Sequence, residues 1–201
     1  MEYHKKNALF LHIPKCGGTS VEHALLDLDP MTSGQMQVQD YCGRHYLINY
    51  QHAFPNELLS TWRYFTFTFV RNPWDRFVSY YFHLKKLKLL KVDIDFNTFV
   101  KKFFYGGLQN LIAEISSHKD DYHLFMQPCH SWAYSADYVG RFENFQNDFD
   151  AVCDILDIEK RKLKVLNPTI RKEYSLYYNP ESIEMIGNYY RIDIDNYAYE
   201  F

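Results

Sequence analysis

The sequence predicts an α/β domain whose central parallel sheet is flanked by helices. Short apolar strand patterns alternate along the chain with amphipathic helical patterns, as in parallel α/β folds. The strongest strand pattern, residues 64–71, is apolar on both faces, which is typical of a central strand covered by helices on each side. The length of 201 residues suits a single domain, residues 1–201, with ample chain for a core.

The first strand pattern, residues 8–13, leads directly into a candidate anion-binding loop. Pro14 closes the strand because it cannot donate a hydrogen bond to a sheet. A helical pattern follows with Val21, Ala24 and Leu25 on one side. The connecting loop reads Pro14-Lys15-Cys16-Gly17-Gly18-Thr19-Ser20. Glycines let backbone N–H groups approach an anion closely, and a helix N-terminus adds partial positive charge. We therefore expect a phosphate site; the alternative is an ordinary strand–turn–helix with a solvated lysine.

This loop differs from that of nucleotide triphosphatases. A Walker A loop reads G-x-x-x-x-G-K-[ST], with the lysine after the second glycine. Here Lys15 precedes both Gly17 and Gly18, and no Gly-Lys-Ser/Thr occurs in the chain. Thr19 and Ser20 supply hydroxyl groups, and Lys15 supplies a full positive charge.

The other predicted elements follow in order along the chain. They are a strand at 46–52, a short helix from 56, the strand at 64–71, a helix from Pro73 to Leu84, a helix near 96–104, a strand at 137–142, a helix at 145–156 and a last helix at 182–190. Because parallel strands carry ligand sites at their carboxyl ends, residues that directly follow these strands are the candidates for function.

A second candidate anion site follows the strand at 64–71. Arg71 ends that strand, and Ser79 lies eight residues later, about two helical turns up the next helix. Arginine offers a planar fork that suits a phosphate, and serine offers a hydroxyl donor. The alternatives are an ion pair between Arg71 and Asp75, and a small packing role for Ser79.

Composition excludes several functional classes. The formal net charge is −3, so no global basic field favours nucleic acid. No apolar run is long enough to span a membrane and the N-terminus lacks a signal segment, so we expect no integral membrane segment and a cytoplasmic location. The scattered cysteines predict free thiols. These are Cys16, Cys42, Cys129 and Cys153.

Histidine and cysteine residues near position 125 do not predict a metal site. They are His118, His123, Cys129 and His130. Their spacing matches no usual zinc-ligand pattern. We expect no metal.

Together the two anion motifs resemble those of sulfotransferases that use 3′-phosphoadenosine 5′-phosphosulfate (PAPS). Pro-Lys-x-Gly-Gly-Thr-Ser resembles the 5′-phosphosulfate-binding loop, and the segment 69–81, Phe-Val-Arg-Asn-Pro-Trp-Asp-Arg-Phe-Val-Ser-Tyr-Tyr, resembles the 3′-phosphate-binding motif. Residues 138–149, Asn167 and residues 193–201 are similar to the carbohydrate (membrane-type) sulfotransferase family, which includes heparan 2-O- and chondroitin 4-O-sulfotransferases. Residues 30–45 and 85–135 are not covered convincingly.

The resemblance implies a P-loop-like three-layer fold and a set of roles. PAPS would be the donor and PAP the product, with a carbohydrate acceptor. Lys15 would act on the 5′-phosphate and the bridging oxygen, and Arg71 with Ser79 would bind the 3′-phosphate. Arg171 could close over the nucleotide. The 5′-phosphosulfate would be held by Pro14, Lys15, Cys16, Gly17, Gly18, Thr19 and Ser20.

An acceptor hydroxyl needs a general base within hydrogen-bond reach. His52 ends the predicted strand at 46–52, on the same sheet edge as Lys15 and Arg71, and its segment also resembles a histidine-bearing segment of this family. Glu57 and Glu22 are the alternatives. We interpret the other histidines as structural or solvated; among them, His12 is predicted to be a satisfied buried histidine and His23 to pack or face solvent.

Two other functional classes remain open. A small-molecule kinase should show a Gly-Lys-Ser/Thr and a metal-binding aspartate. A non-catalytic nucleotide-binding module would keep Arg71 and Ser79 but lack a base near Lys15.

Overall fold

The computed structural model describes residues 2–3, 6–28, 65–90, 92–107, 125–166 and 170–201. The chain divides into two compact units, and each is treated by itself. The first, which we call the sheet unit, comprises Met1–Arg71 and Ser131–Leu166. The second, the helical unit, comprises Asn72–His130 and Asn167–Phe201. The predicted strand at 46–52 and the helix from 56 lie outside the described residues.

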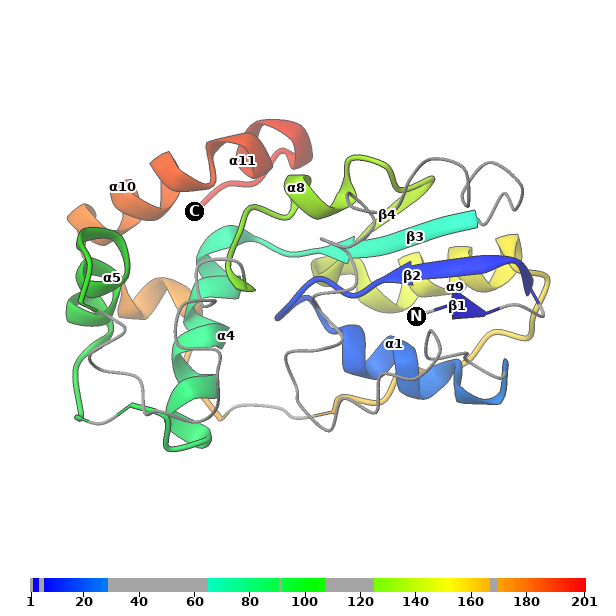
Figure 1. The fold of residues 1–201 in the computed structure, drawn as a ribbon, viewed down its shortest axis with the longest axis horizontal. Coiled ribbons are helices and arrows are strands. Elements are labelled where there is room, and N and C mark those ends of the chain that lie inside the picture. Colours follow the sequence, from blue (N-terminus) through cyan, green and yellow to red (C-terminus); the bar gives the residue numbers. More distant parts are fainter. Residues whose placement is uncertain (1, 4–5, 29–64, 91, 108–124, 167–169) are drawn as a thin grey trace. The chain divides into compact units, whose positions relative to one another are not determined.

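Within the described residues, the sheet unit contains four strands in the order β1-β2-β3-β4 (Figure 1). Their bounds are Glu2–Tyr3 for β1, Ala8–Leu11 for β2, Phe65–Val70 for β3 and Tyr138–Arg141 for β4. β2, β3 and β4 run parallel, which confirms the predicted parallel α/β sheet. β1 pairs antiparallel with β2 and was not predicted, because two residues carry no hydrophobic period.

β2 ends two residues before the predicted end at residue 13. After Leu11 the chain turns: Ile13 N donates to Leu11 O at 3.1 Å, and Cys16 N donates to Ile13 O at 3.3 Å. These local bonds satisfy backbone groups that would otherwise pair with β3. The turn therefore starts at His12 rather than at Pro14.

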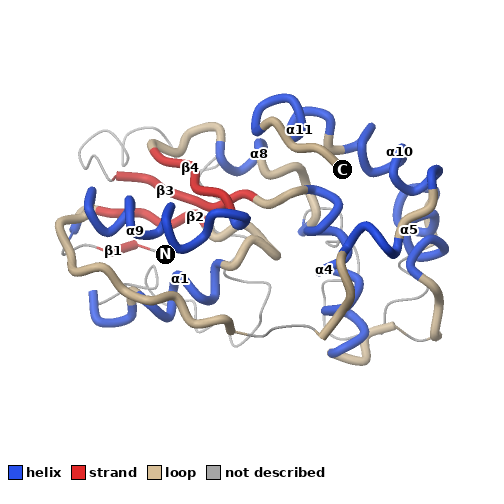
Figure 2. Tube along the Cα trace, turned by 180° about the vertical axis from the view of Figure 1, so that it is seen from behind, coloured by secondary structure: helices blue, strands red, loops and turns tan. Residues whose placement is uncertain are grey.

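The core of the sheet unit joins the strands to two helices. Helix α1 spans Gly18–Ala24, a 3₁₀ turn follows at Leu26–Leu28, and helix α9 spans Phe145–Ile155 after a 3₁₀ turn at Phe142–Asn144. Phe10, Phe67 and Phe69 of the strands pack with Val21 of α1 and Phe149 of α9. Each of these five side chains is at most 1% exposed, so this cluster is the interior that fixes β2 against α1. Figure 2 shows the strands of this unit together with α9.

The helical unit is built from helices around an aromatic core. They are α4 (Pro73–Lys86), α5 (Phe96–Tyr105), the 3₁₀ turn Tyr174–Tyr177, α10 (Pro180–Tyr189) and α11 (Arg191–Tyr197). The core centres on Phe77, whose ring lies 4.9 Å from that of Phe103, centroid to centroid. The predicted helices that start at Pro73, near 96 and at 182 are present. α11 was not predicted, nor was the four-residue helix α8 (His130–Ala133).

Local capping explains where two of these helices begin. The Asn72 side chain accepts hydrogen bonds from Trp74 N at 3.0 Å and Asp75 N at 3.4 Å, and Pro73 occupies the first helical position. At α10, Asn179 and Ser182 form a reciprocal capping box. Asn72 thus caps α4, which begins at Pro73, two residues after Arg71 in the sequence.

Buried polar side chains hold residues 125–130 in the helical unit. Arg76 is fully buried and donates to Gln127 O at 2.7 Å and Phe125 O at 3.2 Å. Asp193 is 1% exposed and accepts from Cys129 N and His130 N, each at 2.7 Å. Burial raises the pKa of Asp193 above the usual range for a carboxyl group. The backbone N–H groups of Cys129 and His130, two residues of the histidine–cysteine group considered above for zinc, thus donate to the Asp193 carboxyl group.

Two features are absent from the residues that the structure describes. None of their helices is both long and apolar enough to cross a membrane. Within the same residues, no group of three or more His, Cys, Asp or Glu side chains is arranged to hold a metal ion. His118 and His123 lie outside the described residues.

Candidate active site

The loop between β2 and α1 has a backbone shape that two residues define. Lys15 has φ 65° and Gly17 has φ 86°, both in the left-handed region. Gly17 forms the N-cap of α1, and glycine adopts that conformation without strain. Lys15 is a non-glycine residue there, so surrounding contacts must hold its backbone. The Lys15 side chain is half-buried.

Aromatic rings close one side of the loop at Gly17. A Cβ atom at this position would lie 2.5 Å from Phe145 Cζ and 3.1 Å from Phe142 Cδ2. Real Cβ atoms essentially never approach other atoms as closely as 2.5 Å, so any side chain here would displace Phe145. Glycine at position 17 is therefore required by packing as well as by φ.

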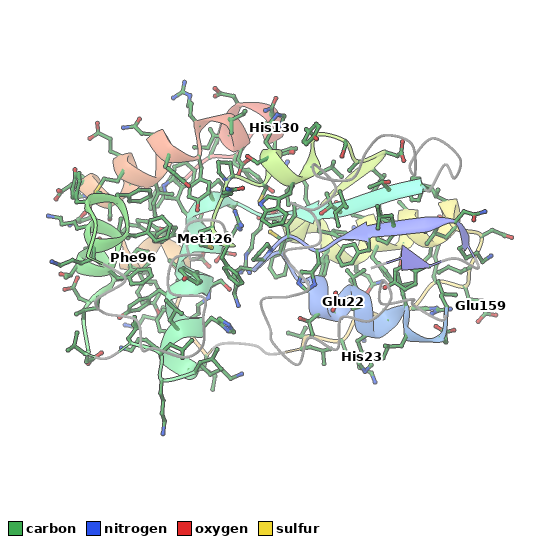
Figure 3. The ribbon with its side chains drawn as sticks, viewed as in Figure 1. Glu22, His23, Phe96, Met126, His130 and Glu159 are labelled. Atoms are coloured by element: carbon green, nitrogen blue, oxygen red, sulfur yellow. The ribbon has the colours of Figure 1, made fainter. Side chains whose placement is uncertain are left out.

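A buried pair supports the loop at Gly18. His12 Nδ1 lies 2.7 Å from Glu22 Oε1, and the two residues are 8% and 4% exposed. The carboxylate accepts and the imidazole N–H donates. Figure 3 shows Glu22 on α1 and His23 on the same helix, where His23 is exposed. The prediction that His12 is a satisfied buried histidine is confirmed, and its partner is Glu22. Tyr3, whose pKa is raised by burial and by the Glu22 charge, belongs to the same interior.

Gly18→Ala should destabilise the protein by about 1–3 kcal/mol through overpacking. A Cβ at position 18 would lie 2.3–2.6 Å from three atoms of the His12 ring, and Glu22 holds that ring in place. Chemical denaturation should show a lower unfolding midpoint for this variant than for the matched control Thr19→Ala. The double variant His12→Asn/Gly18→Ala should recover part of the loss, since asparagine is smaller and can still donate to Glu22. Equal midpoints for Gly18→Ala and Thr19→Ala would contradict this account.

The remaining loop side chains make local contacts. Cys16 is a buried thiol whose Sγ donates to Pro14 O at 3.6 Å. Ser20 is 6% exposed, and its Oγ accepts from Leu166 N at 3.5 Å. Thr19 is half-buried. These contacts shape the loop, and the Ser20 hydroxyl proton can still be donated elsewhere.

Arg71 lies beside this loop at the carboxyl end of β3. Its Nη1 donates to Lys15 O at 3.0 Å, and its guanidinium carbon lies 3.9 Å from the centroid of the Phe142 ring. Arg71 is only 7% exposed. The structure thus brings together, at one edge of the sheet unit, Lys15, Cys16, Gly17, Gly18, Thr19, Ser20 and Arg71.

Two other predicted binding residues belong to the helical unit. Ser79 lies on α4 and is 8% exposed. Arg171 forms an ion pair with Asp75, the residue named above as an alternative partner of Arg71. Both side chains of that pair are largely buried, at 14% and 16% exposure. The proposed roles of Ser79 and Arg171 in nucleotide binding stay predictions.

Of the three candidate bases, only Glu22 lies among the residues that the structure describes. His52 and Glu57 lie outside the described residues. Glu22 is buried and hydrogen-bonded to His12, an arrangement that suits support of the loop better than proton transfer to an acceptor.

Phe142 and Phe145 were missed as part of the site. The sequence places Phe142 at the end of the predicted strand at 137–142 and Phe145 at the start of the predicted helix at 145–156, and both lie in the segment 138–149 that resembles a family, but neither is predicted as a site residue. The usable signal was two aromatic residues three apart just beyond the carboxyl end of a parallel strand, where ligand sites form.

Comparisons with known proteins identify the family. A search of curated proteins finds no match. Among solved structures, a sulfotransferase from Alicyclobacillus acidocaldarius is similar, with 17% identity and a TM-score of 0.42. The match covers 76% of this chain and 60% of that one, so this chain spans less than two thirds of the other protein's length. The Sulfotransferase family matches residues 3–200. This match confirms the family predicted from the two anion motifs: the chain belongs to the Sulfotransferase family.

Proposed function

We propose that the protein transfers the sulfuryl group of PAPS to a hydroxyl of a carbohydrate or glycoconjugate and releases PAP. The observation that carries the proposal is the grouping of Lys15, the Gly17–Gly18 turn and Arg71 at the carboxyl edge of β2 and β3. Membership of the Sulfotransferase family supports the same reaction. A reducing compartment such as the cytoplasm suits the buried thiols Cys16, Cys129 and Cys153.

The residues present fit the phosphosulfate end of PAPS. Gly17 and Gly18 present backbone without side chains, and Lys15 adds a positive charge beside them. We assign the 5′-phosphosulfate to Pro14, Lys15, Cys16, Gly17, Gly18, Thr19 and Ser20. The 3′-phosphate is assigned to Arg71 and Ser79, and Arg171 to the nucleotide. Arg71 supplies charge-assisted donors, which are the stronger class of hydrogen bond to phosphate.

The transfer requires one bond to form and one to break at sulfur. The acceptor oxygen forms the new S–O bond while the S–O bond to the 5′-phosphate breaks, and Lys15 stabilises the negative charge that develops on the leaving oxygen. We propose His52 as the base that takes the acceptor proton, with Glu57 and Glu22 as alternatives. No metal is required, because positioning and fixed charges supply the stabilisation.

The test is a comparison of PAP, 5′-AMP and ATP by thermal shift and by calorimetry. PAP should bind roughly tenfold to a hundredfold more tightly than 5′-AMP, because it alone carries the group that Arg71 and Ser79 would meet. Ligand binding to the folded state raises apparent stability, so the shift should follow the same order. Equal binding of PAP and 5′-AMP would remove the case for a 3′-phosphate site. If, of the three nucleotides, only ATP in the presence of Mg²⁺ stabilised the protein, the kinase alternative would be favoured.

Transfer itself is tested with labelled PAPS. We expect label to move to a member of a sugar panel, with phenols and lipids as comparison acceptors. PAP binding without transfer to any acceptor class would favour a non-catalytic nucleotide-binding module.

A further inference from the structure

We propose that Phe142 is a positioning residue for Arg71, so that preference for a 3′-phosphate depends on an aromatic ring at position 142. The inference rests on the proposed function, because it concerns the residue assigned to that phosphate. Phe142 is thereby added to the site. Its ring need not touch the nucleotide, because it acts on nucleotide choice through Arg71.

Two contacts between described residues orient the Arg71 guanidinium within the sheet unit. Its carbon Cζ lies 3.9 Å from the Phe142 ring centroid, well inside the roughly 6 Å range of cation–π attraction. Its Nη1 donates to Lys15 O at 3.0 Å. The ring therefore sets where the face of the group lies, and the carbonyl sets one of its N–H directions. Arg71 is 7% exposed, so both contacts act where water screens them weakly.

Phe142 is itself held by the turn between β4 and α9. It opens the 3₁₀ turn Phe142–Asn144, and Arg141 N donates to Asp148 Oδ2 at 2.5 Å just before it. The ring also packs on that of Phe145, with 5.2 Å between centroids and 38° between planes. The position of Phe142 is thus set by β4 and α9, independently of Arg71.

The same ring reaches the anion loop. A Cβ at Gly17 would lie 3.1 Å from Phe142 Cδ2, so the ring lies against the glycine turn as well as against Arg71. Arg71 in turn supports the carbonyl of Lys15, whose backbone holds the left-handed φ of 65°. Phe142, Arg71 and Lys15 form one contiguous set of contacts that links the end of β3 to the loop after β2.

Removing the Phe142 ring should affect the binding of PAP more than the binding of 5′-AMP. An arginine has five N–H donors in a rigid fork, so its value to a phosphate depends on the orientation of that fork. Removing the ring leaves the charge of Arg71 in place but frees its plane. The 3′-phosphate of PAP should then lose aligned hydrogen-bond donors. The contacts of the groups that PAP and 5′-AMP share should change equally for the two nucleotides.

The experiment measures the ratio of 5′-AMP to PAP dissociation constants by calorimetry. Phe142→Leu and Phe142→Met should lower that ratio roughly tenfold, toward the value of Arg71→Ala, because a cation–π contact at a desolvated site is lost. Phe142→Tyr keeps a ring and should retain the wild-type ratio. Using both leucine and methionine guards against a variant that misfolds, and thermal melts report folding separately.

Phe65→Leu is the matched control. Phe65 packs on Phe67 in the same unit, 5.9 Å between ring centroids, at the amino end of β3 and therefore at the opposite end of that strand from Arg71, so its loss should leave the ratio unchanged. A wild-type ratio in Phe142→Leu and Phe142→Met, with Arg71→Ala reduced, overturns the role of Phe142. Equal binding of the two nucleotides by the wild-type protein overturns the proposed function instead.

Discussion

Lys15→Ala should reduce turnover with PAPS by about 10²–10³-fold, the cost of removing one donor aimed at a developing oxyanion. The lysine charge matters most as the leaving oxygen becomes negative, and that charge is present only in the transition state. PAP binding should weaken by no more than roughly tenfold, since the lost group then acts as one charged hydrogen-bond donor among several. The measurement is steady-state turnover beside calorimetric PAP affinity.

Replacing Lys15 by alanine should leave the backbone of the loop unchanged. The contact with Arg71 uses the carbonyl of Lys15, which alanine retains. At φ 65° alanine and lysine are strained alike, so the backbone cost of that conformation should not change. Lys164→Ala, an exposed lysine of the same unit, is the matched control and should leave both quantities unchanged. If Lys15→Ala weakened PAP affinity and raised KM by the same factor while kcat stayed unchanged, Lys15 would only tether the nucleotide. Its assigned role in the transition state would then be wrong.

The sheet and the place of the loop followed from the sequence because each rested on a strong local pattern. β2 is a continuous apolar run, β3 is rich in aromatic and β-branched residues, and the glycine turn follows β2 within a few residues. Parallel pairing then required both carboxyl ends to meet at one edge. The contact between Arg71 and Lys15 O is the direct outcome of that geometry.

Contacts between elements distant in sequence could not be predicted in the same way. His12 was expected to be satisfied, but its partner Glu22 is ten residues away on another element, and no spacing rule connects them. Phe142 reaches Arg71 across a separation of 71 residues, from a turn after β4. Periodicity finds faces of helices and strands, while such pairs depend on how the elements are packed.

Short elements were missed for a different reason. β1 has two residues and α8 has four, which is too few for a hydrophobic period to be counted. α11 follows α10 after the single residue Tyr190, so one pattern of apolar positions runs into the next. Because no glycine or proline stands at the break between these two helices, the residue types there do not indicate that one helix ends and another begins.

His52→Ala should lower turnover by ~10²–10⁴-fold while PAP affinity stays at the wild-type value, because a general base acts on the acceptor hydroxyl and not on the nucleotide. The wild-type rate should also fall at low pH, since only the neutral imidazole accepts a proton, with a limb in the ordinary histidine range of roughly 6–7. The measurements are turnover against pH for both proteins and calorimetric PAP binding.

His23→Ala is the matched control, because that imidazole is exposed on α1, and it should leave turnover unchanged. A carboxylate base would instead place the acidic limb near the ordinary glutamic acid value of roughly 4.3. Loss of the limb together with loss of rate in His52→Ala would assign the proton transfer to His52. Near-normal turnover in His52→Ala would move the assignment to Glu57 or Glu22. Glu57→Gln separates those two: a loss of rate with PAP affinity unchanged would assign the proton transfer to Glu57, and an unchanged rate would leave Glu22. Glu22→Gln should weaken PAP binding as well as the rate, because Glu22 contacts His12 in the buried support of the loop.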